Sequence, residues 1–305
     1  MPPVSPGPRA GGAGSGQNPR DRLAAVTDDP IRIRAASTRA DLETCVLLQR
    51  AVWGLSDLEI TSALQLTATL HAGGLLHLAE TAAGEAVAFA YAFPAIRGGV
   101  AQLHSDMLAV LPAHQERGIG GRLKWAQREA ALAAGVSLMT WTFDPLQARN
   151  ANLNLRRLGA TAMEFLENFY GVTSSSLHHR LPTDRLLVYW NLRSSRVEAL
   201  AEKRERNMPS AVPDLPRVNE VKWQAGWPVS SDPVLDLDAP ELLLEIPPDW
   251  DILARSAPRV AETWQARIRK AFQSYLSRGY VGADFALTQD GGRRRPFYVL
   301  RKKKG

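Results

Sequence analysis

Apolar and polar positions along the chain form a pattern that predicts a mixed α/β domain between residues 31 and 193. Two-residue alternation and short apolar runs predict strands at 31–35, 75–80, 85–93, 102–110, 137–143 and 184–192. Apolar residues at helical spacing predict helices between Thr38 and Gly54, at 59–71, after Gly118 and at 149–158. The order is one strand, two helices, three strands, and then helix, strand, helix and strand.

The two ends of the chain differ from this domain in composition. Residues 1–30 are rich in Pro, Gly and Ala, which predicts a disordered tail and no signal peptide. Residues 194–240 form a charged, proline-dotted linker. Beyond it, a small α/β subdomain over 241–305 is predicted from a strand at 241–246, a helix at 258–278 and a hairpin around Asp290-Gly291-Gly292.

The net charge of +6 raises the question of a nucleic-acid partner. Much of the excess lies in two C-terminal runs, Arg293–Arg295 and Arg301–Lys304, which we interpret as solvated flanks. No known nucleic-acid-binding motif accompanies them, so nucleic acid is not an expected partner. No apolar run approaches membrane-spanning length, so we expect no membrane contact.

Cysteine and histidine usage adds two expectations. The single cysteine, Cys45, lies on the apolar face of a predicted helix, which indicates a core thiol in a reducing, cytoplasmic setting. No His or Cys pair has zinc-ligand spacing, His178-His179 included, so we expect no metal.

The most informative segment joins the strand at 102–110 to the helix after Gly118. Its sequence is Gln115-Glu116-Arg117-Gly118-Ile119-Gly120-Gly121-Arg122. Glycines let a ligand approach the backbone, and the unpaired amides of a helix start attract anions. A P-loop needs Lys before Ser or Thr, and a dinucleotide loop needs a small residue where Leu123 stands. The segment therefore predicts a phosphate cradle of another kind, or a glycine-rich turn that opens an ordinary helix.

The pattern Gln-x-x-Gly-x-Gly resembles the coenzyme A signature of the GNAT acyltransferase superfamily. The order of predicted elements is that of the GNAT fold, and the resemblance covers about residues 31–192. It implies a mixed α/β sheet, acetyl-CoA or succinyl-CoA as co-substrate, and a cofactor site made by Leu108, Ala109, Val110, Gln115, Glu116, Arg117, Gly118, Ile119, Gly120, Gly121, Arg122 and Asn150. The C-terminal extension is then a degenerate GNAT-like half that covers the acceptor side, or an appended subdomain with no catalytic role.

A closer resemblance concerns a GNAT subgroup, some of whose members are associated with N-acylation of amino acids, including succinyl transfer. It rests on Trp141-Thr142-Phe143-Asp144-Pro145-Leu146, Arg149-Asn150, Leu158-Gly159-Ala160, Asn168-Phe169-Tyr170-Gly171 and Thr183-Asp184-Arg185-Leu186. It implies an N-acyltransferase for a small primary amine, with an amino acid as the expected acceptor.

The family resemblance also implies direct attack of the amine on the thioester. The fourth and fifth strands should splay near the loop, so that the amide of Leu108 or Ala109 polarises the thioester oxygen. Strand periodicity places Gln102, His104, Asp106 and Leu108 on one face. His104 and Asp106 are therefore the candidate bases, unless both are only tied to neighbouring elements.

The general acid is harder to place. Many GNAT enzymes have a tyrosine four residues before the glycine that ends the following helix, and here that position holds Leu155. Tyr170 is our substitute, with a packed, hydrogen-bonded aromatic as the alternative. Asn150 and Asn154 share a helix face, so one of them is a candidate for the pantetheine path.

For the acceptor we expect an apolar wall over Trp141–Leu146, a carboxylate at Asp144 and a cation at Arg149. A succinyl group would need a second cation, for which Arg157 or Arg185 is a candidate. An exposed helix-start residue is the alternative for Arg149. Two other functions stay open: an acyl-CoA-binding regulatory protein without turnover, and a protein or peptide N-acetyltransferase. A homodimer also stays open.

Overall fold

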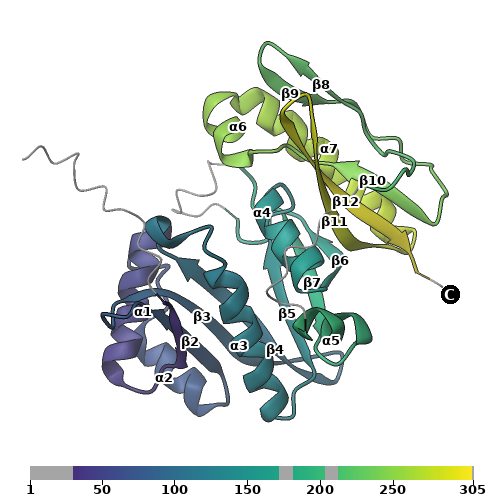
Figure 1. Cartoon of the computed structure of the whole chain (residues 1–305). Coiled ribbons are helices and arrows are strands. Elements are labelled where there is room, and N and C mark those ends of the chain that lie inside the picture. Colours follow the sequence, from purple (N-terminus) through teal and green to yellow (C-terminus); the bar gives the residue numbers. More distant parts are fainter. Residues whose placement is uncertain (1–29, 172–180, 203–211, 304–305) are drawn as a thin grey trace, which may run out of the picture. The chain divides into compact units, whose positions relative to one another are not determined.

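The computed structural model describes residues 30–171, 181–202 and 212–303 (Figure 1). The expected tail, His178-His179 and Lys304 lie outside the described residues. The described residues from Ile31 onward form one compact unit, built on a ten-stranded mixed sheet in the order β1-β2-β3-β4-β5-β7-β6-β11-β12-β10. The α/β class expected from the sequence is confirmed.

The first seven strands belong to the predicted domain. They are β1 (Arg32–Ala35), β2 (Leu75–Glu80), β3 (Ala86–Arg97), β4 (Val100–Val110), β5 (Leu138–Phe143), β6 (Thr161–Leu166) and β7 (Arg185–Asn191). The order of elements expected of a GNAT fold is confirmed, with one strand added. The sequence analysis missed β6, which follows Gly159 and lies between β7 and β11 in the sheet.

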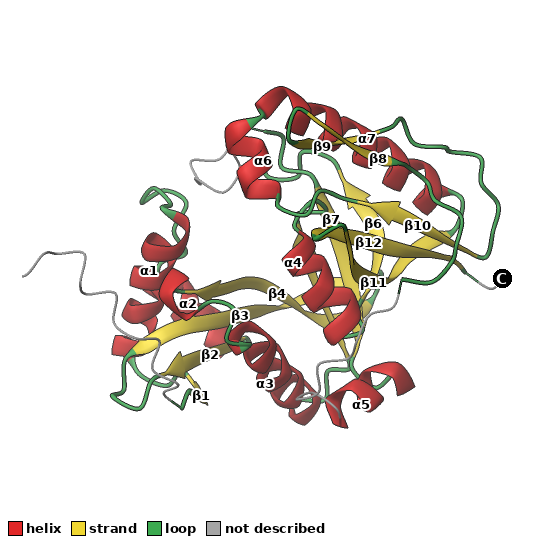
Figure 2. Ribbon diagram, turned by 45° about the horizontal axis from the view of Figure 1, so that its top comes forward, coloured by secondary structure: helices red, strands yellow, loops and turns green. Residues whose placement is uncertain are grey.

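Helices cover both faces of this part of the sheet (Figure 2). On one face, α1 (Arg39–Trp53) and α2 (Ala63–His71) enclose a cluster with the side chains of Phe89, Tyr91, Met107 and Ala109. On the other, α3 (Ile119–Ala133) packs Ile119 and Leu123 against β3 and β4. We call these the α1/α2 face and the α3 face. α2 begins four residues later than predicted, because Ser62 caps it.

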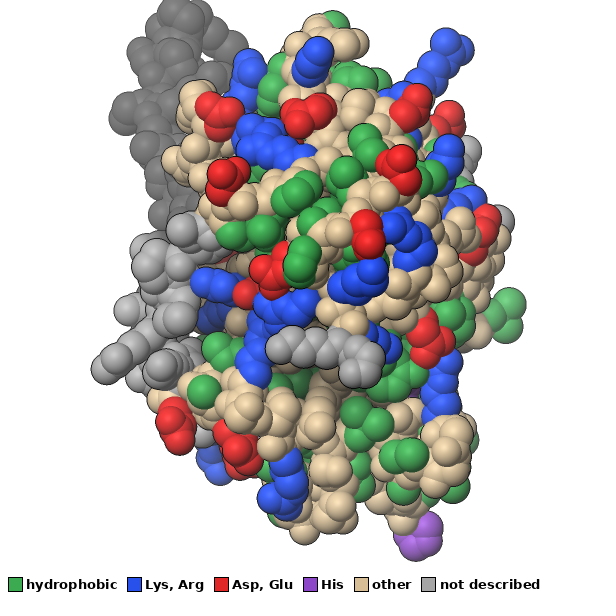
Figure 3. Space-filling view, turned by 90° about the vertical axis from the view of Figure 1, so that its right-hand side faces the viewer, with side chains coloured by type: hydrophobic (Ala, Val, Ile, Leu, Met, Phe, Trp, Pro, Cys, Tyr) green, Lys and Arg blue, Asp and Glu red, His purple; other side chains and the backbone are tan. Residues whose placement is uncertain are grey.

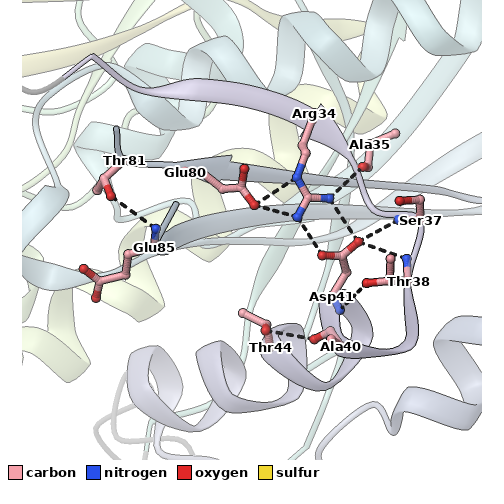
Figure 4. Close-up of polar contacts among 10 residues, drawn as sticks. All are labelled: Arg34, Ala35, Ser37, Thr38, Ala40, Asp41, Thr44, Glu80, Thr81 and Glu85. Carbon is pink, nitrogen blue, oxygen red and sulfur yellow. Dashed lines mark hydrogen bonds and ion pairs between the residues drawn. The ribbon is translucent and has the colours of Figure 1, made fainter. Parts of the chain in front are cut away.

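The junction of β1 and α1 is fixed by a charged cluster (Figure 4). Arg34 binds both oxygens of Asp41, at 3.0 and 2.6 Å, and Glu80 on β2 at 2.6 Å. The Arg34 guanidinium holds the pKa of the Asp41 carboxyl well below its usual range. Thr38 and Asp41 also form the predicted capping box, and Gly54 ends the helix at φ 62°. Cys45 is fully buried, and burial raises the pKa of its thiol to about 12, which confirms a core thiol.

The C-terminal part extends the same sheet. Its elements are α6 (Trp250–Ser256), α7 (Pro258–Ser277), β10 (Glu241–Glu245), β11 (Tyr280–Asp290) and β12 (Arg293–Lys302). β11 joins β6 where Gly282 lies opposite Ala162. A Cβ on Gly282 would lie 3.0 Å from that of Ala162, so the approach of the two strands needs glycine. The hairpin around residues 290–292 is confirmed, and α6 was missed.

The predicted linker over residues 194–240 contains more structure than its composition indicated. α5 (Ser195–Glu202) follows β7, and a two-stranded sheet is formed by β8 (Val221–Gln224) and β9 (Trp227–Ser230). Trp264 of α7 donates to the carbonyl oxygen of Pro228, so this sheet packs on the C-terminal helix.

The basic runs at the C-terminal end are not simply solvated flanks. Arg295 pairs with the buried Glu245, Arg301 with Glu241, and Lys302 with Asp238. On the face drawn in Figure 3, basic side chains accordingly lie beside acidic ones. Among the described residues, no helix combines the length and the apolar character needed to cross a membrane.

Candidate functional site

The glycine segment forms the loop between β4 and α3. A short 3₁₀ turn, η2 (Pro112–His114), follows β4, and the backbone then takes left-handed conformations at Glu116 (φ 65°) and Gly118 (φ 73°). Gly118 precedes the first residue of α3, and no side chain caps the helix there. Its first-turn amides are therefore available to an anion, which is what the predicted cradle requires.

Side chains around this loop differ from expectation. Arg122 turns away from the loop and donates to the carbonyl oxygen of Ile31, which precedes β1, at 2.5 Å, while Arg117 lies 3.2 Å from His114. Arg149 instead reaches the loop from the next helix, donating to Gln115 at 2.9 Å and Glu116 at 3.1 Å. The sequence analysis assigned Arg149 to the acceptor, but its side chain lies on the predicted cofactor loop.

The splay between β4 and β5 is present. The two parallel strands pair only at Leu103 with Met139 and at His104 with Thr140. Beyond these pairs, β4 keeps its antiparallel pairing with β3 through Val110 but has no pairing with β5. The backbone edge of β4 is therefore open for an extended ligand over its last six residues.

The backbone hydrogen bonds show which amides of β4 point to the splay and which point to β3. Leu111 donates to Val87 on β3, and the carbonyl oxygen of Val110 accepts instead from the side chain of Gln115. Since backbone groups alternate in direction along a strand, Leu108 directs its amide to the splay and Ala109 directs its amide to β3. Leu108 is thus the candidate oxyanion donor, and Ala109 is not.

A β-bulge in β4 corrects the predicted strand faces. Tyr91 pairs with Met107 and Phe93 with His104, so one extra residue lies on β4 between these pairs. Ser105 faces α3, where it donates to Gln127, whereas Met107 packs with α1 and α2. The prediction that His104, Asp106 and Leu108 share one face is therefore wrong beyond residue 105.

His104 lies at the vertex of the splay on the α1/α2 face. Its Nδ1 is 3.1 Å from the hydroxyl of Thr140, and its ring lies 5.2 Å from that of Phe93. Burial, with smaller contributions from Lys124 and Arg97, lowers the pKa of His104 to about 4. The imidazole is therefore neutral at physiological pH and is a weak base.

Asp106 occupies the bulge itself. Its side chain is exposed to solvent, yet the surrounding protein raises the pKa of its carboxyl above the usual value by desolvation. A carboxylate with a raised pKa is a better proton acceptor than a normal one. Of the two candidate bases, Asp106 has the more suitable chemistry.

The predicted apolar wall is part of the core. Trp141, Phe143 and Leu146 are nearly inaccessible to solvent. Trp141 packs edge-on against Trp190, and the Nζ of the buried Lys124 lies 3.5 Å from the Trp141 ring centroid. Burial lowers the pKa of Lys124 well below its usual value. No pattern in the sequence indicated that this lysine of α3 would be buried.

Tyr170 lies on the turn between β6 and β7. Its hydroxyl is 3.1 Å from that of Thr142 on β5, and the guanidinium of Arg185 lies 5.3 Å from its ring centroid.

Burial raises the pKa of the Asp144 carboxyl, which follows β5, to about 6. The Asp144 carboxylate accepts a hydrogen bond from the amide of Leu146, whereas Arg149 donates to Gln115. The two residues expected together at the acceptor therefore share no hydrogen-bond partner.

The helix after β5 is irregular. α4 (Ala148–Ala151) continues as a π-helical segment, η3 (Asn152–Arg157). This segment changes the helical register, so Asn150 is exposed while Asn154 is buried, and the two do not share a face as expected. Leu155 is fully buried close to β11, where its Cδ1 would lie 3.6 Å from a Cβ on Gly282. Arg157 is exposed on the same segment.

Metal ligands do not gather anywhere in the described part of the chain: it contains no group of three His, Cys, Asp or Glu side chains that could hold an ion. The geometry described above makes the glycine loop, the open edge of β4 and the polar groups at the splay the candidate site.

Comparisons with known proteins give structural matches only. No protein-family model and no curated protein sequence matches the chain. An acetyltransferase structure from Salmonella typhimurium, solved as YncA with its cofactor acetyl-CoA, is 20% identical, covers 54% of this chain and 95% of its own, and has a TM-score of 0.44.

Two further matches have similar extents. The ribosomal-protein-S18-alanine N-acetyltransferase of Escherichia coli is 16% identical over 54% of this chain and 96% of its own, with a TM-score of 0.43. A GNAT family acetyltransferase from Elizabethkingia anophelis, with acetyl-CoA bound, is 18% identical over 53% of this chain and 97% of its own, with a TM-score of 0.39. Each solved chain is covered almost completely, and about half of this chain is not.

Proposed function

We propose that this chain is an enzyme of the GNAT superfamily, an acyl-CoA-dependent N-acyltransferase that moves an acetyl or succinyl group to a small primary amine, with an amino acid as the expected acceptor. The observation that carries the proposal is the combination of the uncapped α3 start, after the glycine loop, with the open edge of β4. One element suits a pyrophosphate and the other suits a pantetheine arm.

The reaction we propose is direct attack. The amine loses a proton to Asp106, directly or through water, and its nitrogen attacks the thioester carbon. The Leu108 amide stabilises the oxyanion that forms. After attack the nitrogen carries one extra proton, which it gives up to solvent as the amide forms. Collapse of the intermediate breaks the carbon–sulfur bond, and the leaving thiolate takes a proton, for which Tyr170 is the candidate donor and solvent restores its hydroxyl. His104 is the alternative base, and its low pKa makes it more suitable as a neutral hydrogen-bond partner at the vertex.

A second function is favoured by one observation. Leu155 stands where many GNAT enzymes have a tyrosine, and it is fully buried. A protein that binds acyl-CoA as a regulatory ligand, without turnover, would have no need of an acid at this position.

The deciding experiment measures CoA release from acetyl-CoA and succinyl-CoA with a panel of amines, free amino acids and lysine peptides. Steady release that depends on a free amino acid supports the proposed function. Release with lysine peptides alone would indicate a protein or peptide N-acetyltransferase. Stoichiometric acyl-CoA binding with no release across the panel would contradict an enzymatic role.

A further inference from the structure

A polar cluster that the sequence analysis did not find lies on the sheet beside His104. Five strands contribute one residue each, namely Arg97 (β3), His104 (β4), Thr140 (β5), Tyr189 (β7) and Glu164 (β6). The pairing of His104 with Thr140, and of Thr140 with Tyr189, places three of them side by side across the sheet. We call these five residues the five-strand cluster.

An ion pair connects the two sides of the cluster. Arg97 Nη2 lies 2.7 Å from Glu164 Oε2, although β4, β5 and β7 lie between their strands in the sheet. Three intervening strands at about 4.8 Å spacing would separate the two backbones by roughly 19 Å in a flat sheet. The sheet must therefore curl toward the α1/α2 face, so that the side chains of β3 and β6 meet over the strands between them.

Each carboxylate oxygen of Glu164 has its own partner, and the first is the Arg97 guanidinium. Its second oxygen accepts from the hydroxyl of Tyr189 at 2.5 Å, and burial together with Glu164 raises the pKa of that tyrosine to about 12. Both oxygens of the carboxylate are thus engaged, and Tyr189 stays a neutral donor at physiological pH. Glu164 and Tyr189 fix the position of Arg97 and are not free to bind a ligand themselves.

Arg97 has donors to spare. Within the described residues its only hydrogen bond is the one from Nη2 to Glu164, and half of its side-chain surface is exposed. The bond to Glu164 uses one of the two Nη2 hydrogens, so the second Nη2 hydrogen, together with Nη1 or Nε on the same edge, can bind a carboxylate in the fork geometry that arginine favours. The guanidinium also lies close enough to His104 for its charge to lower the pKa of that imidazole.

We propose that Arg97 binds the carboxylate of the acceptor while the amine of the same molecule points to the splay beside His104. The proposal rests on the proposed function and narrows its substrate class to amines that carry a carboxylate. Arg97 then takes the role that the sequence analysis gave to Arg149, whose guanidinium is engaged by Gln115 and Glu116 on the glycine loop.

The test compares amino acids with their amides, in turnover and in direct calorimetric binding to protein saturated with CoA. Arg97→Ala should raise the KM and the Kd of the acid at least tenfold, change those of the amide less than twofold, and leave CoA affinity unchanged. Glu164→Gln, which frees Arg97 without removing its charge, should affect the acid less than Arg97→Ala does. Arg39→Ala is the control, since Arg39 forms only an exposed pair with Glu43 on the surface of α1.

Arg149→Ala separates the two candidate cations. It should weaken acyl-CoA binding and leave the preference for acid over amide intact. A wild-type protein that binds acid and amide equally, or an Arg97→Ala variant that affects both equally, would overturn the proposal. Absence of turnover with every acceptor would instead overturn the proposed function, while the calorimetric arm would still decide whether Arg97 binds a carboxylate.

Discussion

At the scale of single residues, the environment of each polar side chain decides what chemistry it can do. His104 and Asp106 are two residues apart, but desolvation by the surrounding protein lowers the pKa of the His104 imidazole and raises that of the Asp106 carboxyl. The bulge that contains Asp106 also separates the two on the strand. His104 is therefore a neutral hydrogen-bond partner, and Asp106, two residues further along the strand, is the stronger base.

We predict that Asp106→Asn lowers kcat by about a hundredfold, the usual effect of removing a general base. His104→Ala should lower it less, because an imidazole with a pKa near 4 is a weak base. Acyl-CoA affinity, measured by calorimetry, should stay unchanged in both variants, since neither side chain lies on the glycine loop. Full activity in both would assign proton removal to another group.

Asp144 should make the stability of the protein depend on pH. Its pKa is about 6 in the folded protein and 3.8 in its ordinary state, so the folded protein holds more protons between these values. Stability contributed by the protonated carboxyl is therefore present below about pH 4 and is lost as the pH rises through 6. Asp144→Asn should remove this dependence and raise stability at pH 7 by up to about 3 kcal/mol. Denaturant unfolding at pH 4 and pH 7 measures it, and identical pH dependence in both proteins would contradict the assignment.

At the scale of elements, the C-terminal helix α7 is joined by ion pairs to the segments on either side of the turn that carries Tyr170. Arg269 binds Asp184 at 2.9 Å and Glu167 at 2.6 Å, and Asp184 in turn accepts from the amide of Asn168. The Asp184 carboxylate is almost fully buried, so Arg269 is its charge partner in a place that water hardly reaches.

Arg269→Met should therefore loosen the turn and lower kcat several-fold, with acyl-CoA affinity unchanged. Tyr170→Phe should lower kcat in the same direction if the hydroxyl is the acid. The matched control is Lys270→Met, because Lys270 is the exposed neighbour of Arg269 on the same helix. If Arg269→Met and Lys270→Met behave alike in steady-state kinetics, the C-terminal helix does not position the site.

Strong local signals were reliable: the Thr38 cap, the glycine loop and the hairpin around residues 290–292 all occur where expected. β6 was missed, and the bulge in β4 was not foreseen, because a bulge depends on the register of the partner strand. The Arg97–Glu164 pair joins residues 67 positions apart, and only the curl of the sheet brings them together.

At the scale of the whole molecule, the two parts of the sheet share one core. A single buried cluster contains Trp141 and Leu155 of the predicted domain together with Trp264, Phe272 and Tyr298 of the C-terminal part. Tyr298 also donates to the carbonyl oxygen of Pro145. The C-terminal part therefore covers the end of β5 as an integral layer of the fold.

We predict a single cooperative transition when residues 31–305 unfold, as expected of one shared core. Phe272→Ala, which removes a ring stacked on Phe165, should destabilise the protein by about 3–5 kcal/mol. Phe89→Ala, in the cluster beneath α1, should lower the same transition. Scanning calorimetry decides: two separate transitions, each moved by only one of the variants, would show that the two parts fold independently.

Coenzyme binding at the glycine loop is tested most directly by calorimetric titration of Gly120→Asp and Gly120→Ala with acetyl-CoA. A Cβ at Gly120 would lie 3.5 Å from Leu108 Cδ2, an ordinary contact, so both variants should fold. We predict that Gly120→Asp abolishes binding, because its carboxylate would stand in the place proposed for the pyrophosphate, while Gly120→Ala retains measurable affinity. Unchanged affinity in a folded Gly120→Asp protein would contradict it, and the loop between β4 and α3 would then not be the site of the coenzyme.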